Sequence, residues 1–170
     1  MIVRYTNPSR IRDQLLHCLD VLGEEYNELD YVVDVYKNED RLRKEMVECP
    51  DMSPEEYQQI LHGATRPPAI AMMESRTIKI FYFNLSTEKH KQDLDLAFFL
   101  FHEMRHAWQN HHGLYLDEEG VANLDENMEE YKNSAAEKDA NEFAMVTIME
   151  NKDKIRKIFK MPDFELNLKW

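Results

Sequence analysis

The 170-residue sequence has few cysteines and no apolar run of membrane-spanning length. Cys18 and Cys49 are too few for a disulfide framework, and neither lies in a CxxC pair that would indicate a zinc ribbon or a redox site. We therefore expect two buried thiols in a reducing compartment. The N-terminal stretch carries charges through its apolar part, so no signal peptide is expected. The predicted location is the cytoplasm, with no membrane partner.

The chain is also poor in the residues that build linkers, with four glycines and six prolines. Its hydrophobic fraction of 43% is enough to fill one core. We therefore predict one domain over residues 1–170, with mostly helical structure.

Basic residues are outnumbered, 21 against 33 acidic ones, and the formal charge is −12. The electrostatic field of this negative charge repels the phosphates of nucleic acids, so no direct nucleic-acid binding is expected. Residues 117–130 hold seven acids and no base. This stretch is most simply a solvated loop, and the alternative is a lip that recruits a basic protein partner.

Hydrophobic periodicity predicts an α+β fold with a small sheet beside a central helix. Apolar residues at helical spacing follow Pro8 as far as Gly23, and Ser53-Pro54-Glu55-Glu56 is a capping box that opens a helix ending at Gly63. The other predicted helices are 39–48, 92–112, 134–149 and 153–159, and the predicted strands are 29–36 and the hairpin 69–74 and 77–83.

The predicted central helix carries the motif His102-Glu103-Met104-Arg105-His106. The i,i+4 spacing puts both imidazoles on one face, one turn apart, as zinc ligation requires. Glu103 lies one residue round from His102, where a carboxylate can act as general base on a water beside the ion. A buried apolar helix has little reason to hold these groups unless they have a partner, although a satisfied core histidine pair is the simpler alternative.

With this motif the chain resembles the zincin metallopeptidases, which carry HExxH on an active-site helix beside a small sheet. Residues 137–144, Glu-Lys-Asp-Ala-Asn-Glu-Phe-Ala, resemble the ExEANxFA-type element of the ImmA/IrrE-like proteins. These are cytoplasmic or phage-related gluzincins associated with cleaving or controlling repressors. The resemblance covers about residues 70–150 and implies a Zn²⁺ cofactor, a protein or peptide substrate and a glutamate as third ligand.

The resemblance places Glu137 at the position of this third ligand, which would complete a His102, His106 and Glu137 set. Two alternatives stay open. Ser134-x-x-Glu137 is also a capping box, in which the glutamate folds back to the backbone of Ser134. Asp139 and Glu142 are the reserve ligands.

Two other zincin branches offer His112 as the third ligand. A metzincin needs a glycine at position 109 to turn the chain, and Gln109 stands there, so the helix should carry His112 away from the metal. In SprT-like proteases the third histidine belongs to an HG element, but His112-Gly113 follows His106 too closely for the chain to turn back.

The predicted function is zinc-dependent hydrolysis of a peptide bond, with Glu103 as general base. Strand 77–83 is the predicted edge that pairs with an extended substrate. Tyr115 and Tyr131 are candidates for stabilising the oxyanion, although each is more simply an interfacial aromatic. The rival prediction is a binding protein, phage-derived or a DNA mimic, whose metal site is structural, vestigial or absent.

Overall fold

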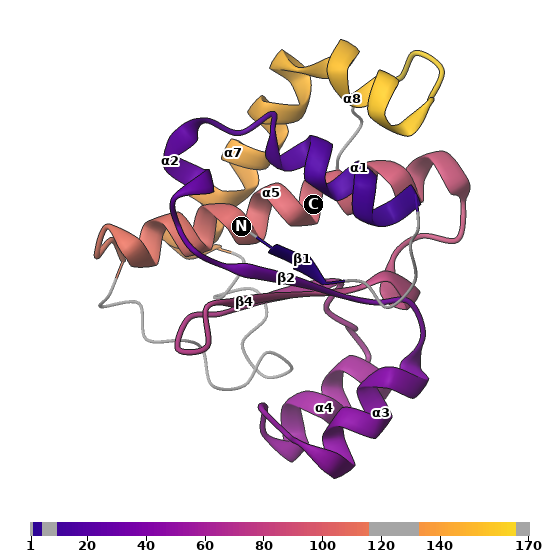
Figure 1. Ribbon diagram of the computed structural model, residues 1–170, viewed down its shortest axis with the longest axis vertical. Helices are drawn as coiled ribbons and strands as arrows, with labels where there is room; N and C mark the ends of the chain where they lie inside the picture. The colour runs from indigo at the N-terminus through magenta and orange to yellow at the C-terminus, as the bar shows by residue number, and fades with distance from the viewer. Residues whose placement is uncertain (1, 5–9, 116–132, 166–170) are drawn as a thin grey trace.

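A computed structural model describes residues 2–4, 10–115 and 133–165, which form the predicted α+β fold. Residues 117–130, Tyr131 and the predicted helix start at Pro8 lie outside the described residues. The strands are β1 (Ile2–Arg4), β2 (Val32–Tyr36), β3 (Ala69–Met72) and β4 (Thr77–Phe81) (Figure 1). The helices are α1 (Arg10–Leu19), α2 (Glu24–Asn27), α3 (Glu39–Glu48), α4 (Pro54–His62), α5 (Lys89–His111), α7 (Ala135–Glu150) and α8 (Lys152–Phe159), with a 3-10 helix at Tyr82–Asn84. Within the described residues, no helix is long and apolar enough to cross a membrane.

The four strands form one mixed sheet in the order β1-β2-β4-β3. β1, β2 and β4 are parallel, while β3 and β4 form the predicted antiparallel hairpin. Because β4 lies between β2 and β3, the prediction that residues 77–83 form the edge is wrong. The edge strand on this side of the sheet is β3. The other side of β4 pairs in parallel with β2, which lies far earlier in the chain.

β2 is shorter than the predicted strand 29–36. It begins at Val32 because Asp30 adopts a positive φ of 53°, which interrupts the extended backbone. In this segment every second residue is apolar, and the sequence predicts that Leu29, Tyr31, Val33 and Val35 face one side. This alternation is confirmed, since all four side chains are buried in one core. Strand β1 was not predicted from the sequence.

The two faces of the sheet are covered by different helices. Figure 1 shows α3 and α4 on one side and α1, α5, α7 and α8 on the other. Ile78 and Ile80 of β4 belong to the large core with α5, whereas Phe81 belongs to a smaller core with α3 and α4. This alternation follows from the two-residue period of a strand.

The central helix α5 starts at Lys89, three residues before the predicted start, and its first half is buried as expected. Side chains of the helix that are at most 1% exposed are Leu96, Ala97, Phe98, Leu100, Phe101, Met104 and Ala107. Helix α7 packs along α5, where the fully buried Ala140 and Ala144 permit a close approach. The two helices that carry the predicted ligands therefore lie side by side.

Helix α4 has the local structure that its sequence predicts. The N–H of Glu56 donates to Oγ of Ser53 at 3.2 Å, and the N–H of Ser53 donates to Oε2 of Glu56 at 2.6 Å. The helix ends at Gly63, where a Cβ would lie 2.5 Å from the carbonyl oxygen of Gln59. Glycine, which has no Cβ, therefore fits at the C-terminal cap of this helix.

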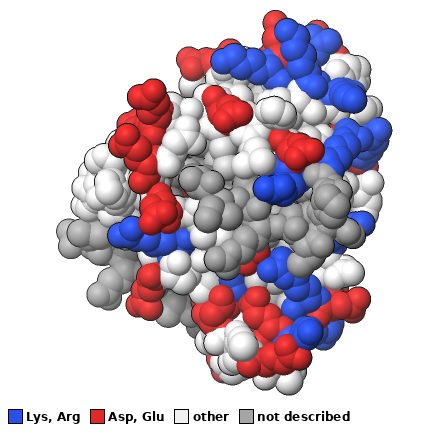
Figure 2. Space-filling model, viewed as in Figure 1, with Lys and Arg blue, Asp and Glu red and all other residues white. Residues whose placement is uncertain are grey.

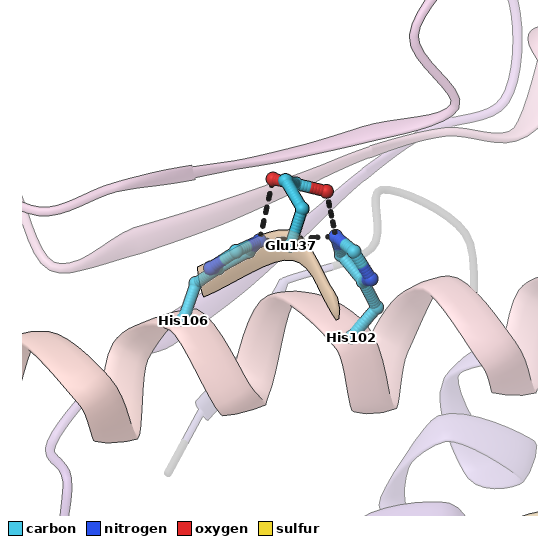
Figure 3. Close-up of side chains that lie close together, drawn as sticks. All are labelled: His102, His106 and Glu137. Atoms are coloured by element: carbon cyan, nitrogen blue, oxygen red, sulfur yellow. Dashed lines mark hydrogen bonds and ion pairs between the residues drawn. The ribbon is translucent and has the colours of Figure 1, made fainter. Parts of the chain in front are cut away.

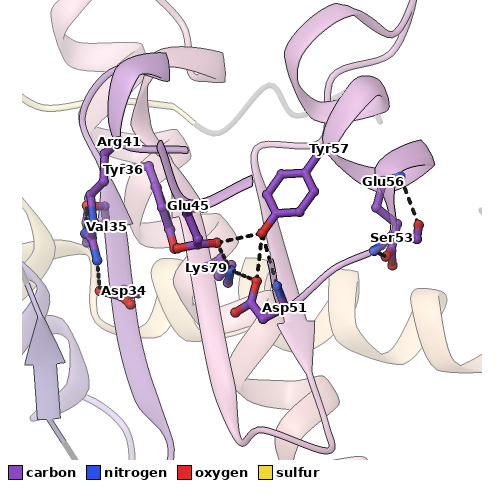
Figure 4. A network of polar contacts seen from close by, with 10 residues as sticks. All are labelled: Asp34, Val35, Tyr36, Arg41, Glu45, Asp51, Ser53, Glu56, Tyr57 and Lys79. Atoms are coloured by element: carbon purple, nitrogen blue, oxygen red, sulfur yellow. Dashed lines mark hydrogen bonds and ion pairs between the residues drawn. The ribbon is translucent and has the colours of Figure 1, made fainter. Parts of the chain in front are cut away.

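The small core under α3 and α4 contains a buried lysine, which Figure 4 shows between two carboxylates. Lys79 of β4 is 1% exposed, and its Nζ lies 2.5 Å from both Glu45 and Asp51. The hydroxyl of Tyr57 lies 3.1 Å from each of these carboxylates, and the hydroxyl of Tyr36 donates to Glu45. This network ties the α3–α4 pair to the sheet, because a buried ammonium needs such partners.

The charged side chains are unevenly distributed over the face in Figure 2, where basic residues gather over α8. This helix carries Lys152, Lys154, Arg156 and Lys157. Nζ of Lys152 pairs with Asp163 at 2.8 Å. A basic region is therefore present although the net charge is −12.

One sequence prediction about the cysteines is wrong. Cys18 is buried in the large core, as expected, but Cys49 is exposed. Cys49 directly follows α3, where the chain leaves the helix on the surface of the small core.

Candidate metal centre

The histidines of the HExxH motif lie on one face of α5, one turn apart. Their Nε2 atoms are 3.0 Å apart, and the ring centroids are separated by 4.6 Å. Both side chains are shielded from solvent, with exposed fractions of 9% for His102 and 13% for His106. The helix therefore presents two imidazole nitrogens to the same small space.

Helix α7 brings Glu137 to the same place, as Figure 3 shows. Oε2 of Glu137 lies 3.3 Å from Nε2 of His102, and Oε1 lies 3.0 Å from Nε2 of His106. Ser134 caps α7 by accepting from the N–H of Glu137 at 3.2 Å. Among the described contacts the capping box is thus only half formed, since the carboxylate faces the histidines.

The three side chains fit a divalent metal ion. One ligand atom from each of His102, His106 and Glu137 lies within 4.8 Å of the others. A tetrahedral zinc ion with bonds of about 2.0–2.1 Å would hold its ligand atoms roughly 3.3 Å apart, close to the contacts of 3.0–3.3 Å seen here. Two imidazole nitrogens that face each other with their lone pairs repel unless a proton or a metal cation lies between them. A metal cation can bind both nitrogens and the Glu137 carboxylate at the same time.

The electrostatics of the cluster show how strongly these groups interact. Burial acts to lower the pKa of His106, but the hydrogen bond that it donates to Glu137 and the charges of Glu103 and Glu137 outweigh this effect and raise the pKa to about 9. Burial acts to raise the pKa of Glu137, but hydrogen bonds and charges from the two histidines lower it well below its usual value. Glu137 is therefore an anion that holds positive charge at this site.

Glu103 is also buried beside the cluster, with 7% of the residue exposed. Burial raises the pKa of its carboxyl group, although the positive charges of His102 and His106 act to lower it. Its carboxylate accepts a hydrogen bond from the backbone N–H of Ala71 in β3. The edge strand of the sheet thus contacts the predicted general base directly.

Asp139, the first reserve ligand, points elsewhere. Oδ2 accepts from Nε of Arg105 at 2.7 Å, and Oδ1 accepts from Nη2 of the same side chain at 3.1 Å. Oδ2 also accepts from Nε2 of Gln109 at 2.7 Å. This agrees with the helical geometry that places Asp139 off the face of Glu137. Glu142, the second reserve, is exposed.

His112 does not join the cluster. Helix α5 continues to His111, as expected without a glycine at position 109, and His112 is an exposed residue at the helix end. Nδ1 of His112 lies 2.9 Å from the carbonyl oxygen of Trp108. Tyr115 is 38% exposed with a φ of 58°, in the turn beyond this helix end.

Two partners of the site were not predicted from the sequence. Oε1 of Gln109 lies 2.8 Å from Nδ1 of His106, and the i,i+3 spacing of these residues was a signal that could have revealed the contact. The hydrogen bond from Ala71 to Glu103 is donated by a backbone N–H, so the identity of residue 71 could not indicate this contact.

No protein-family model, no curated protein and no solved structure matches this chain. The side-chain geometry of the site is therefore the basis for a functional assignment.

Proposed function

We propose that this protein is a zinc-dependent metallopeptidase with a zincin-like site, acting on a protein or peptide substrate in the cytoplasm. The observation that carries the proposal is the convergence of His102, His106 and Glu137 from two packed helices, with Glu103 buried beside them. Bound zinc would lower the pKa of a coordinated water to about 7 and polarise the scissile carbonyl group.

In this proposal Glu103 accepts the proton of the attacking water and passes it to the leaving amine nitrogen. Its raised pKa suits both steps, because a base whose pKa lies nearer to neutrality also returns the proton more readily. The N–H of Ala71 holds the carboxylate by one hydrogen bond and leaves further lone pairs for the water.

The edge strand β3 is the proposed site of substrate pairing, in place of β4. The N–H of Phe81 donates to the carbonyl of Pro68, so Ala69 and Ala71 occupy the alternate positions whose N–H and C=O groups point away from β4. Of these outward groups the N–H of Ala71 is bound to Glu103, and the N–H of Ala69 and the two carbonyls are the groups proposed to pair with substrate. An extended peptide added along this edge would pass directly beside Glu103, which the Ala71 N–H contacts.

The buried carboxylate of Glu103 favours catalysis over a purely structural metal. A structural zinc ion is closed by four protein ligands and needs no general base, whereas a catalytic one keeps a position open for water or substrate. Glu103 lies buried beside His102, His106 and Glu137, where it can act on such a water. This supports an enzyme over the rival prediction of a binding protein with a structural zinc site.

The test is metal analysis of protein purified without chelator, together with hydrolysis of a library of quenched fluorescent peptides. Wild type should hold one zinc ion per chain, and His102→Ala should lose it. Glu103→Gln should keep the zinc and the fold but lose hydrolysis, because an amide cannot act as a base. If wild type and His102→Ala hold equally little zinc, the enzyme assignment fails. If Glu103→Gln retains activity within about tenfold of wild type, the role of Glu103 is wrong.

A further inference from the structure

A chain of polar contacts leads from His106 away from the metal-binding face. Nδ1 of His106 lies 2.8 Å from Oε1 of Gln109. Nε2 of Gln109 donates to Oδ2 of Asp139 at 2.7 Å and to the carbonyl oxygen of Ala136 at 3.0 Å. Asp139 in turn accepts two hydrogen bonds from Arg105. A single buried amide therefore connects a proposed ligand on α5 with two groups on α7.

The orientation of the Gln109 amide follows from its partners. A carboxylate and a carbonyl oxygen can only accept hydrogen bonds, so the NH₂ group must face Asp139 and Ala136. The amide oxygen then faces His106, and this oxygen can only accept. Nδ1 of His106 must therefore carry a proton, and in the neutral ring the lone pair lies on Nε2, the atom that faces Glu137.

We propose that Gln109 is a positioning residue that holds His106 in its Nδ1–H form and fixes the plane of its ring, so that Nε2 is presented to the metal. The proposal rests on the function proposed above and adds a role for a residue that does not touch the ion. Gln109 is only 3% exposed, and a buried amide at this place would be costly without its three partners.

The groups that hold Gln109 are themselves fixed. The guanidinium of Arg105 donates to the hydroxyl of Tyr26 at 2.9 Å and lies over the rings of Trp108 and Phe143, at 4.0 and 5.1 Å from their centroids. With Asp139 held in this way, the NH₂ group of Gln109 has a stationary acceptor.

Gln109 also connects the positions of two proposed ligands. Its contact with the carbonyl of Ala136 lies one residue before Glu137, at the first turn of α7. The same side chain therefore links the ring of His106 to the backbone that carries the Glu137 carboxylate. The corresponding atom of the other histidine, Nδ1 of His102, is buried and has no hydrogen-bond partner in the part of the chain that the structure describes. The network thus serves His106 and not His102.

The experiment compares two buried glutamines changed to leucine. Gln109→Leu keeps the size of the side chain but removes the acceptor, and Gln14→Leu is the matched control, since Gln14 is buried on α1 outside the site. Zinc affinity is measured by competition with a chromophoric chelator. We expect Gln109→Leu to bind zinc at least about 10-fold more weakly than wild type, the size of effect found when such orienting partners are removed, and Gln14→Leu to match wild type. A smaller loss in Gln109→Leu, or an equal loss in Gln14→Leu, would overturn the proposal.

A second readout is independent of the metal. In ¹⁵N-labelled protein, the Nδ1 proton of His106 should exchange slowly with solvent in wild type and fast in Gln109→Leu. Equal exchange in wild type and Gln109→Leu would overturn the role of Gln109 even if wild type binds zinc. If wild type binds no zinc, the proposed function fails, and the exchange rates still decide the orientation of His106.

Discussion

Zinc affinity should rise steeply with pH, because the metal and a proton compete for Nε2 of His106. With a pKa of about 9, His106 is deprotonated in roughly one molecule in three hundred at pH 6.5 and about one in ten at pH 8.0. The apparent zinc affinity should therefore increase roughly 30-fold over this range, equivalent to about 2 kcal/mol. The side chain is only 13% exposed, so solvent screening reduces this figure little.

The assay is chelator competition at several pH values, combined with titration calorimetry in two buffers of different ionisation enthalpy. Binding near pH 7 should release close to one proton from His106. Glu137→Gln removes the carboxylate that raises the pKa of His106, so its affinity should be lower and its pH dependence flatter. Glu142→Gln, an exposed change on the same helix, should follow wild type. An affinity that stays constant between pH 6.5 and 8.0, with no proton release, would refute the reasoning.

The stability of the metal-free protein should depend on pH with the opposite sign. The pKa of His106 is raised on folding from 6.5 to about 9, so its stabilising effect is complete below pH 6.5 and is lost as the pH rises through 9. The pKa of Glu137 is lowered from 4.5, so its effect is present above pH 4.5 and is lost under acid conditions. Thermal unfolding of the metal-free protein should thus occur at lower temperature at pH 9 than at pH 6.

Three further predictions concern other parts of the chain. Lys79→Met should lower the free energy of unfolding by about 3 kcal/mol, because two carboxylates lose their buried cation, and urea denaturation with an unchanged midpoint would contradict this. In native protein a thiol reagent should modify Cys49 and spare Cys18, whose burial also raises the pKa of its thiol, whereas equal rates would show that the large core opens readily. If residues 117–130 recruit a basic protein partner, binding to basic peptides should weaken as salt rises and lose this dependence when the seven acids are neutralised; an unchanged salt response would leave a solvated loop.

The features predicted well from the sequence are those set by local chemistry. The capping box at Ser53, the N-cap Ser134 and the alternation along β2 each depend on residues a few positions apart, and all are confirmed. The same is true of His102 and His106, whose shared face follows from the helical repeat alone.

The features that could not be predicted depend on pairing across long distances in the chain. β4 is a central strand because it pairs with β2, whose residues lie more than forty positions earlier in the chain. No local pattern in the sequence distinguishes this arrangement from an isolated hairpin. The carboxylate of Glu137 had two local possibilities, a cap or a ligand, and the packing of α7 on α5 determines which groups it faces. Lys79 looks like an exposed residue of an alternating strand until the α3–α4 pair covers it.

The arrangement of the two cysteines offers a way to attach the protein to a surface. Cys49 is exposed at the end of α3, on the side of the sheet opposite α5, while Cys18 is enclosed in the large core. A maleimide tether at Cys49 would therefore attach every molecule by the same point, on the side of the sheet away from the helix that carries the HExxH motif.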